Sequence, residues 1–255
     1  MIGMGSKNDM EKNDYIFGLR AVMEALESGR HIDKVLMRRD LSGDLAKELS
    51  QALKLYDIPV QKVPAEKLNR ITMKNHQGVI ALLAAAPYHK LENVIPALYE
   101  EGKNPFILVL DGVTDTRNFG AIARSADCAG VDAIVIPERG SASVTPDAMK
   151  TSAGALLYVP VCREKDLTKA ITFLRENGLK IVAATEKGAE DYTKVDMSVP
   201  TAVVMGAEET GISDDILRQA DSLAAIPLRG RIGSLNVSVA AGVLMYEVVR
   251  QRGEG

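Results

Sequence analysis

Tryptophan is absent from this 255-residue sequence, and cysteine and histidine are scarce, with two and three copies respectively. The two cysteines, Cys128 and Cys162, stand alone, without the CxxC or Cys/His spacing that indicates a zinc site. Two isolated cysteines also cannot build the disulfide framework of a small secreted domain. We therefore expect both cysteines to be small core residues, and we expect no metal site.

Long apolar runs are missing as well. No stretch approaches the roughly 20 consecutive apolar residues of a membrane-spanning helix, and the start, MIGMGSKNDMEKNDY, is polar where a secretory signal has an apolar segment. These features predict a cytoplasmic protein with no membrane partner. Residues 1–14 are charged and poor in aliphatic side chains, so we expect a mobile tail there.

An excess of positive charge is also lacking, since the net charge is −3. Nucleic-acid binders usually gain affinity by neutralising phosphates, so this value alone argues against them. Residues 1–85, however, carry 13 Lys and Arg against 11 Asp and Glu, whereas residues 105–255 carry 16 against 20. Two local groups of basic residues lie in the N-terminal part: Arg30, Lys34, Arg38 and Arg39, and Lys62, Lys67, Arg70 and Lys74. Such groups are more often solvated faces than RNA contacts.

The residues that are present suit a soluble globular protein, because 46% are hydrophobic and 25% are charged. Residues 15–85 predict a small α/β domain. Its helices are expected over 18–28 and 43–55, and its strands over 34–37, 59–63 and 79–83. His76, in the polar turn before the last strand, either satisfies local backbone groups or contacts a nucleotide. Residues 86–104 contain two prolines and mixed charges, and we expect them to form a linker.

Residues 105–255 alternate between short apolar strands and helices. Strands are expected over 107–110, 133–136, 158–161, 181–184, 202–205 and 223–226. Helices are expected over 119–129, 148–157, 167–176, 214–219 and 235–252. Short continuous apolar strands separated by helices predict a parallel sheet that is covered on both faces. The fold class is therefore α/β.

Three of these strands end in an unusual way. Glycine and polar or charged residues directly follow the buried strand in the stretches Leu110–Gly130, Val203–Ser213 and Ile226–Glu247. Ligands of parallel sheets bind beyond the carboxyl ends of the strands. Three such strand ends together predict one binding site.

Single residues in these stretches allow two interpretations. Arg124 lies among small residues of a helix, so it either points into a cleft or pairs on the surface with Asp115 or Asp127. Glu208 is either a functional carboxylate or a solvated loop charge. The sequence leaves both pairs of alternatives open.

These loops also contain candidate helix starts and glycines that leave the backbone accessible. Asn118 and Ser234 precede predicted helices and suit N-cap positions, and Gly206 and Gly211 allow a ligand to approach the backbone closely. Neither GxGxxG nor GxxxxGK[ST] occurs, so a dinucleotide or nucleoside triphosphate is not indicated. We expect a small ligand that is held by loop backbone.

Taken together, three motifs resemble those of the SpoU/TrmH branch of the SPOUT RNA methyltransferases. They are Asn118-Phe-Gly-Ala-Ile-Ala-Arg124, Gly206-Ala-Glu208-Glu-Thr-Gly211, and Ile226-Pro-Leu-Arg-Gly230 continued by Ser234-Leu-Asn-Val-Ser238. The segment Asn75-His-Gln-Gly-Val-Ile-Ala81 is similar to the end of the substrate-binding domain in the RlmB-type ribosomal RNA guanosine 2′-O-methyltransferases of that branch. The resemblance covers nearly the whole chain from Tyr15.

This resemblance implies an S-adenosylmethionine-dependent enzyme that methylates an RNA ribose 2′-hydroxyl, with a guanosine of large-subunit ribosomal RNA as the expected acceptor. It further implies a homodimer, a deep trefoil knot in a methyltransferase domain over 105–255, and a ribosomal-protein-like RNA-binding domain over 15–85. The positions that match donor-binding residues are Met205, Gly206, Ile226, Leu228 and Leu235. The positions that match catalytic or supporting residues are Asn118, Arg124, Glu208, Ser234 and Asn236.

The family proposal makes Arg124 the base, but a guanidinium is not deprotonated in proteins. Our hypothesis is that Arg124 stabilises the developing oxyanion while a substrate phosphate or water takes the proton. The chain departs from the family pattern at Thr116, Glu209 and Leu228, where Pro, Gly and Met are common, and none of these changes removes a catalytic group. A transfer RNA methyltransferase and a non-catalytic RNA-binding protein with the same fold are the alternatives.

Overall fold

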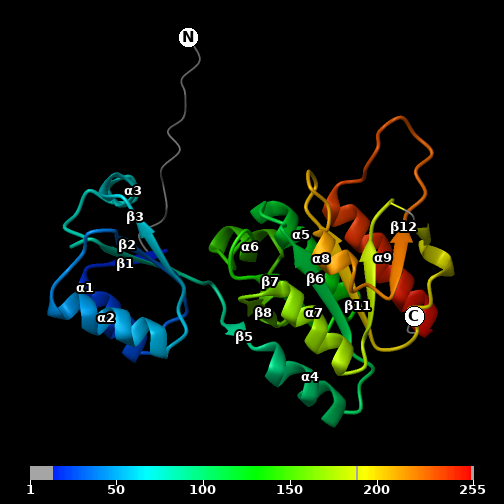
Figure 1. The fold of residues 1–255 in the computed structure, drawn as a ribbon, viewed down its shortest axis with the longest axis horizontal. Helices are drawn as coiled ribbons and strands as arrows, with labels where there is room; N and C mark the ends of the chain where they lie inside the picture. The colour runs from blue at the N-terminus through cyan, green and yellow to red at the C-terminus, as the bar shows by residue number, and fades with distance from the viewer. Residues whose placement is uncertain (1–13, 188, 254–255) are drawn as a thin grey trace. The chain divides into compact units, whose positions relative to one another are not determined.

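The computed structural model describes residues 14–187 and 189–253 (Figure 1). The tail expected over residues 1–14 therefore lies outside the described residues, except for its last residue. The chain divides into two compact units. One consists of the residues up to Ala85 with the short segment Val144–Pro146, and the other of the remaining residues from Ala86 onward.

The first unit is built on a four-stranded sheet with the strand order β1-β4-β2-β3. Its strands are β1 (Tyr15–Phe17), β2 (Ile32–Arg38), β3 (Val60–Val63) and β4 (Val79–Leu83), and its helices are α1 (Leu19–Glu27), α2 (Asp44–Leu55) and α3 (Ala65–Asn69). Side chains of a strand alternate between the two faces of its sheet. Val35 and Met37 therefore enter a core with α1 and α2, whereas Leu36 enters a smaller core with Leu68 of α3.

Sequence patterns did not reveal β1 and α3, because three strand residues and a single helical turn are too short to show a period. The polar turn before β4 is present as predicted, with positive φ angles at Gln77 and Gly78. The Nδ1 atom of His76 accepts a hydrogen bond from the N–H of Gly78 at 3.0 Å. Gln77 Oε1 accepts one from the N–H of Leu19 at 3.1 Å, at the start of α1. His76 thus satisfies local backbone, as the first of its two interpretations predicted.

The second unit contains an eight-stranded sheet with the order β10-β12-β9-β11-β6-β7-β8-β5, and every pair in it is parallel. Its strands are β5 (Tyr88–His89), β6 (Phe106–Asp111), β7 (Ala133–Pro137), β8 (Val161–Glu164), β9 (Lys180–Ala184), β10 (Glu190–Asp191), β11 (Thr201–Gly206) and β12 (Ser222–Ala225). Its helices are α4 (Leu91–Glu100), α5 (Thr116–Cys128), α6 (Pro146–Thr151), α7 (Leu167–Glu176), α8 (Asp214–Leu217) and α9 (Val237–Arg252), with the 3-10 turns η1 (Ala155–Leu157) and η2 (Tyr192–Lys194). The predicted parallel α/β sheet is therefore confirmed.

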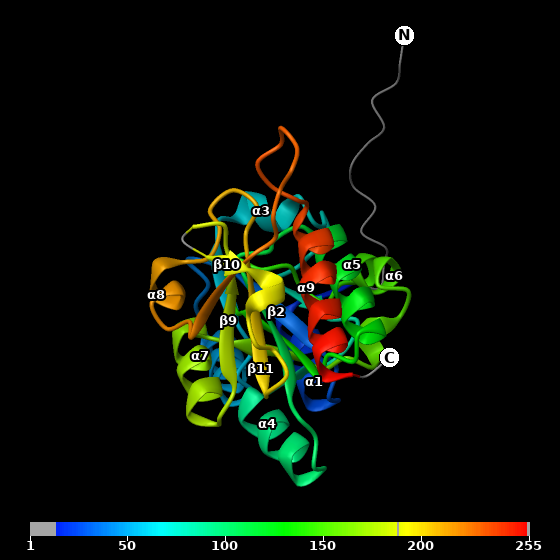
Figure 2. The same ribbon diagram turned by 90° about the vertical axis from the view of Figure 1, so that its right-hand side faces the viewer.

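Helices cover both faces of this sheet (Figure 2). Alternate strand residues such as Ile107 and Val204 pack with α4, α7 and α8 in one core. On the opposite face α5 and α9 pack against each other, and α9 also contacts β11. The two layers leave the carboxyl ends of the central strands at one edge, where helices and loops begin.

The prediction of a linker over residues 86–104 was wrong. This stretch forms β5 and α4 instead, and Leu91, Ile95 and Leu98 of α4 are buried in the core of the second unit. Pro96 lies within α4, in its second turn. The helix tolerates it because packing of its apolar side contributes more to its stability than intrinsic propensity does.

The single helix expected over 148–157 is interrupted. Ala153 and Gly154 adopt left-handed backbone angles, with φ of 52° and 89°, and these residues separate α6 from η1. The next strand consequently begins at Val161 rather than at Tyr158, which is exposed. Cys162 in that strand is buried, as predicted, but Cys128 at the end of α5 is exposed, so the prediction for Cys128 was wrong. No helix in the described part of the chain is long and apolar enough to cross a membrane.

Candidate active site

The three chemically unusual loops follow β6, β11 and β12. In the sheet β6 is a neighbour of β11, and only β9 separates β11 from β12. Because all four strands are parallel, their carboxyl ends lie at the same edge. Three stretches that are distant in sequence therefore meet, as their composition predicted.

Asn118, Glu208 and Asn236 form one hydrogen-bonded group, and each comes from a different one of the three stretches. Asn118 Nδ2 donates to Glu208 Oε1 at 3.2 Å, and Asn236 Nδ2 donates to the same oxygen at 2.9 Å. Asn236 Nδ2 also donates to Asn118 Oδ1 at 3.0 Å, and the N–H of Val237 donates to Glu208 Oε1 at 3.3 Å. One carboxylate oxygen of Glu208 thus holds three donors, while its Oε2 accepts no hydrogen bond from any described residue. Glu208 is therefore not a merely solvated loop charge.

Neither helix at this group starts where the sequence predicted. Asp115 is the N-cap of α5 and accepts from the N–H of Asn118 at 2.8 Å, so the N-cap interpretation of Asn118 was wrong. Asn236 is the N-cap of α9 and accepts from the N–H of Ser238 at 2.9 Å, so the same interpretation of Ser234 was wrong. An N-cap must directly precede the first helical turn. Asn118 already lies inside α5, whereas the chain stays irregular and exposed beyond Ser234, up to residue 236.

The loop after β11 is a tightly closed turn. Ala207 and Gly211 exchange two backbone hydrogen bonds, of 3.2 and 2.8 Å, and Gly211 has a φ of +68°. A Cβ atom on Gly206 would lie 2.2 Å from the carbonyl carbon of Gly211, so only glycine fits there. The turn is tied to the neighbouring strand, because Asp111 Oδ2 accepts from the N–H of Ser213 at 2.7 Å. Glu208 is thereby carried on rigid backbone.

Two cavities flank this turn. The first, which we call the Gly206 cavity, has a volume of about 260 Å³. Seven of the predicted site residues line it: Met205, Gly206, Glu208, Ile226, Leu228, Ser234 and Leu235. It therefore gathers all five predicted donor-binding residues, with aliphatic side chains beside exposed backbone.

The second cavity, which we call the Asn118 cavity, has a volume of about 270 Å³. Its lining includes Asn118 and the residues from Gly112 to Asp115. The two cavities share Glu208 and its neighbours in the 207–210 turn as well as Val237. Glu208 thus lines both cavities, while Asn118 lines only the second, and Asn236 joins them through its hydrogen bonds.

Arg124 is the predicted site residue that this geometry does not include. It lies on α5 with an exposed side chain and lines neither cavity. Within the described parts of the chain it also makes no ion pair, with Asp115, Asp127 or any other residue. Arg124 therefore forms neither of the surface pairs considered from the sequence, and it lies outside both cavities of its own chain.

Thr185, Glu186 and Lys187 also line the Gly206 cavity, and sequence reasoning missed them. These polar residues directly follow β9, so the rule that identified the other three strand ends would have found them. Among residues 14–187 and 189–253, no group of three His, Cys, Asp or Glu side chains is arranged to hold a metal ion.

Both units match models of known protein families. The model of the SpoU rRNA Methylase family matches residues 105–246, which contain the hydrogen-bonded group and both cavities. The chain belongs to the SpoU/TrmH family. The model for RNA 2′-O ribose methyltransferase substrate binding matches residues 15–89, so the SpoU/TrmH architecture extends over the first unit. As a family member, the protein is an RNA methyltransferase with a parallel α/β catalytic domain.

Relatives agree with this assignment over almost the whole chain. YacO of Bacillus subtilis (strain 168), assigned to the TrmH family of tRNA/rRNA methyltransferases, is 36% identical, over 95% of this chain and 97% of YacO. A protein of Staphylococcus aureus (strain MSSA476) with the same assignment is 37% identical, over 93% of this chain and 96% of its own length. Their coverage shows that SpoU/TrmH relatives share both units.

Solved structures of RNA-modifying enzymes have a similar fold. An AdoMet-bound rRNA methyltransferase from Sinorhizobium meliloti matches with a TM-score of 0.60 and 26% identity, over 93% of this chain and 87% of that chain. AviRb from Streptomyces viridochromogenes, in complex with the cofactor AdoMet, gives the same score and identity over 94% and 91%. A TrmH/SpoU tRNA modifying enzyme from A. aeolicus is 30% identical with a TM-score of 0.55, over 64% of this chain and 85% of that chain.

Proposed function

We propose that this protein is an S-adenosylmethionine-dependent ribose 2′-O-methyltransferase that acts in the cytoplasm on a guanosine of large-subunit ribosomal RNA. The observation that carries the proposal is the position of Glu208, which lines two adjacent cavities and accepts hydrogen bonds from Asn118 and Asn236. A methyl transfer needs one site for the donor and an adjacent site for the acceptor. The Gly206 cavity suits the donor, and the Asn118 cavity suits the acceptor nucleotide.

The residues of the Gly206 cavity fit S-adenosylmethionine in chemical type. An adenine ring needs aliphatic surfaces, which Ile226, Leu228 and Leu235 provide, and its polar edge needs backbone groups, which the neighbouring loops provide. The closed turn that lines the cavity requires glycine at position 206, because a Cβ there would collide with the backbone of Gly211 and Ile212. When bound, S-adenosylmethionine supplies a methyl group that is activated by the sulfonium. The two family structures with AdoMet support the same assignment.

The polar group around Glu208 has a positioning task. Glu208 accepts hydrogen bonds from the amide groups of Asn118, which lines the acceptor side, and of Asn236, while Ser234 lies in the lining of the donor side. Fixed groups of this kind orient a reacting hydroxyl, and orientation alone can contribute about 7–11 kcal/mol to lowering a barrier. The ribose proton passes to a substrate phosphate or water in this proposal.

We propose that Arg124 acts across a homodimer. Its side chain does not reach the cavities of its own chain, and α9 and η1, which both pack against α5, expose large apolar side chains nearby in the fold. These side chains are Leu157, Tyr158, Val239 and Tyr246, which are 63%, 77%, 52% and 53% exposed. Apolar surface of this kind is typical of a subunit interface. A C-terminal trefoil knot, which family resemblance implies, is part of the same proposal.

Ribosomal RNA is favoured over transfer RNA by the extent of the structural matches. The rRNA methyltransferase from S. meliloti matches 93% of this chain, whereas the tRNA modifying enzyme from A. aeolicus matches 64%. The residues matched only by the rRNA methyltransferase are about as many as the first unit contains, and that unit lies outside the catalytic domain. A non-catalytic RNA-binding role is disfavoured, because such a protein would not need the ordered group around Glu208.

The test is a titration calorimetry experiment followed by RNA mapping. The protein should bind both S-adenosylmethionine and its demethylated product. Ribosomal RNA from a strain lacking the gene should have lost one ribose methylation, and the purified enzyme should restore it. Loss of a methyl group from transfer RNA instead would identify the alternative substrate, and absence of donor binding would refute the enzymatic proposal.

A further inference from the structure

We propose that the first unit binds the phosphate backbone of RNA through the surface made by α3 and the loop that follows it, residues 64–78, which we call the α3 surface. The inference rests on the proposed function, since it takes RNA as the substrate. The family model that matches residues 15–89 describes substrate binding by this unit without specifying a face. Charge, exposure and rigidity together select this one.

Positive charge is concentrated on the α3 surface. Lys67, Arg70 and Lys74 are exposed, and Glu66 is the only acidic residue between positions 64 and 78. The opposite face of the sheet is covered by α1 and α2, which carry three basic and four acidic residues: Arg20, Lys47 and Lys54, and Glu24, Glu27, Asp44 and Glu48. The α3 surface thus has a net positive charge and α1 and α2 together a net negative one, so an RNA backbone is attracted more strongly to the α3 surface.

The cations are presented on an ordered support. Leu68 is fully buried, and with Ile71 it packs onto Leu36 and Ile80 of the sheet. The loop is fixed by its own hydrogen bonds, since His76 Nε2 and Asn69 Oδ1 lie 2.9 Å apart and Thr72 Oγ1 accepts from the N–H of Lys74 at 3.3 Å. Preorganised side chains bind with less loss of conformational entropy.

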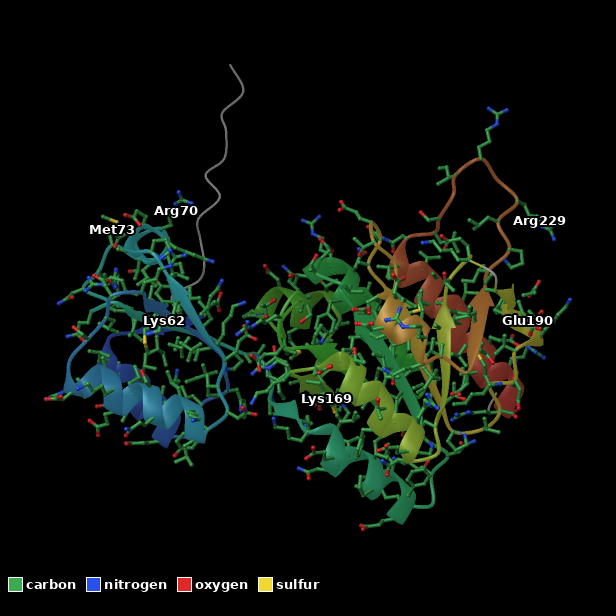
Figure 3. All side chains as sticks on the ribbon, in the orientation of Figure 1. Lys62, Arg70, Met73, Lys169, Glu190 and Arg229 are labelled. Carbon is green, nitrogen blue, oxygen red and sulfur yellow. The ribbon has the colours of Figure 1, made fainter. Side chains whose placement is uncertain are left out.

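Aromatic and apolar groups lie beside the charges. The Nζ atom of Lys74 is 5.9 Å from the ring centroid of Phe17, whose ring is next to that of Tyr15 at 6.2 Å. Met73 is 86% exposed, and Figure 3 shows it projecting outward with Arg70 beside α3. Cations interleaved with exposed apolar side chains suit RNA, in which unpaired bases accompany phosphates.

Lys62 does not belong to this surface, although it is close to the others in sequence. Its Nζ donates to the buried Sδ atom of Met37 at 2.9 Å, on the α1 and α2 side of the sheet. The four basic residues are therefore near one another in sequence, but only Lys67, Arg70 and Lys74 lie on the α3 surface.

The experiment compares two triple variants of the full-length protein. The test variant carries Lys67→Ala, Arg70→Ala and Lys74→Ala, and the matched control carries Arg20→Ala, Lys47→Ala and Lys54→Ala. Both lose three exposed cations, so their net charges are equal. The probe is protein-free large-subunit ribosomal RNA from a strain that lacks the gene, and binding is measured by filter retention at several salt concentrations.

The test variant should bind this RNA on the order of tenfold or more weakly than the control at equal salt, and the slope of log K against log [salt] should fall by about 0.7–0.9 per lost contact. S-Adenosylmethionine affinity should equal that of the wild type in both variants, which verifies that the second unit is intact. Urea unfolding of both variants should match that of the wild type, which verifies that the first unit is folded. Equal RNA binding by the two variants would overturn the inference. If the wild-type protein neither binds the donor nor methylates RNA, the proposed function fails instead.

Lysine reactivity gives a second readout that needs no variant. In wild-type protein, bound RNA should protect Lys67 and Lys74 from acetylation, while Lys47 and Lys54 should react as in the free protein. Protection of Lys47 and Lys54 with full reactivity of Lys67 and Lys74 would contradict the proposal directly.

Discussion

At the scale of single residues, one carboxylate oxygen of Glu208 holds the polar group of the site together. Its Oε1 accepts three hydrogen bonds, from the amides of Asn118 and Asn236 and from the N–H of Val237. The Asn236 amide is also held by the N–H of Ser238, so the carboxylate acts together with the N-cap of α9 to orient both asparagines. We therefore expect substitutions here to affect catalysis more than donor affinity.

Asn118→Ala removes one donor and one acceptor from this group but leaves Asp115 as the N-cap of α5. We expect the rate of methyl transfer to fall on the order of 10²–10³-fold, because oriented polar groups act mainly in the transition state. Single-turnover transfer and calorimetric donor binding separate the two effects. Asn93→Ala is a matched control, since Asn93 occupies the third position of α4 as Asn118 does in α5, and its side chain is exposed. A parallel loss in donor affinity would contradict the expected role.

Gly206→Ala should abolish donor binding. The new Cβ would lie 2.2 Å from the Gly211 carbonyl carbon and 2.4 Å from the Ile212 nitrogen, and backbone atoms of a closed turn cannot move away cheaply. We expect a loss of about 1–3 kcal/mol in the free energy of unfolding from this overpacking. Gly230→Ala is the control, because nothing lies within 4 Å of a Cβ there, and it should bind S-adenosylmethionine normally. Calorimetry and urea unfolding test both variants, and normal donor binding by Gly206→Ala would refute the tight fit.

At the scale of elements, the C-terminal end of α9 is held in place by a polar cluster. Glu247 is buried and accepts from Arg250 Nε at 2.8 Å and from Gln251 Nε2 at 2.7 Å. Gln251 also accepts from the N–H of Met197 at 2.7 Å and donates to Val195 O at 2.9 Å. The helix is thereby attached to the segment before β11, whose far end carries the Gly206 turn.

The hydrogen bond from Arg250 lowers the pKa of Glu247 below its ordinary value, against an opposing effect of burial. Stability gained from a lowered carboxyl pKa is fully present above the unfolded-state pKa and is lost as the pH falls through the folded-state pKa. We therefore expect Glu247→Gln to lose about 1–3 kcal/mol at pH 7. The difference from wild type should shrink at pH values below about 4.

Urea unfolding at several pH values measures this difference. The control is Glu176→Gln at the exposed end of α7, which should match wild type at every pH. A deficit of Glu247→Gln that stayed constant with pH would show that the charge of Glu247 contributes nothing.

At the scale of the whole molecule, the proposed dimer is open to a direct test. Tyr246→Asp introduces a charge into the exposed apolar side of α9, and we expect it to shift the protein toward monomer, because an unpaired charge is costly to bury in an interface. Sedimentation velocity across a concentration series measures the change. Tyr56→Asp is the matched control, since Tyr56 in the first unit is 51% exposed against 53% for Tyr246. Equal association of both variants would place the interface elsewhere.

Mixed dimers test whether Arg124 acts on the partner subunit. Arg124→Ala and Glu208→Ala should each be inactive alone. A heterodimer of the two would contain one complete site if Arg124 acts across the dimer, so it should regain about half of the wild-type rate per dimer. If Arg124 acts within its own chain, each subunit lacks one group and the heterodimer stays inactive. Tandem affinity tags isolate the heterodimer for this assay.

Long periodic elements could be predicted well from sequence, and short or irregular ones could not. The parallel sheet followed from continuous apolar runs such as those of β6 and β11, which have buried residues on both faces. β1, α3 and β5 were missed because two to five residues carry too little pattern. The sequence of α4 contains a proline and mixed charges, which are typical of a linker. The helical spacing of Leu91, Ile95 and Leu98 was the weaker signal.

The sequence by itself determined the fold class, the three strand-end loops and the chemical types of the site residues, since these depend on local composition and period. Tertiary structure alone decided that Asn118, Glu208 and Asn236 share hydrogen bonds, because residues about 30 to 120 positions apart meet only when the strands before them pair. It also decided that Asn236 rather than Ser234 caps α9, that Lys62 faces away from Lys67 and Lys74, and that Arg124 lies outside both cavities. Helix start and side-chain direction depend on packing partners, and those partners come from distant parts of the chain.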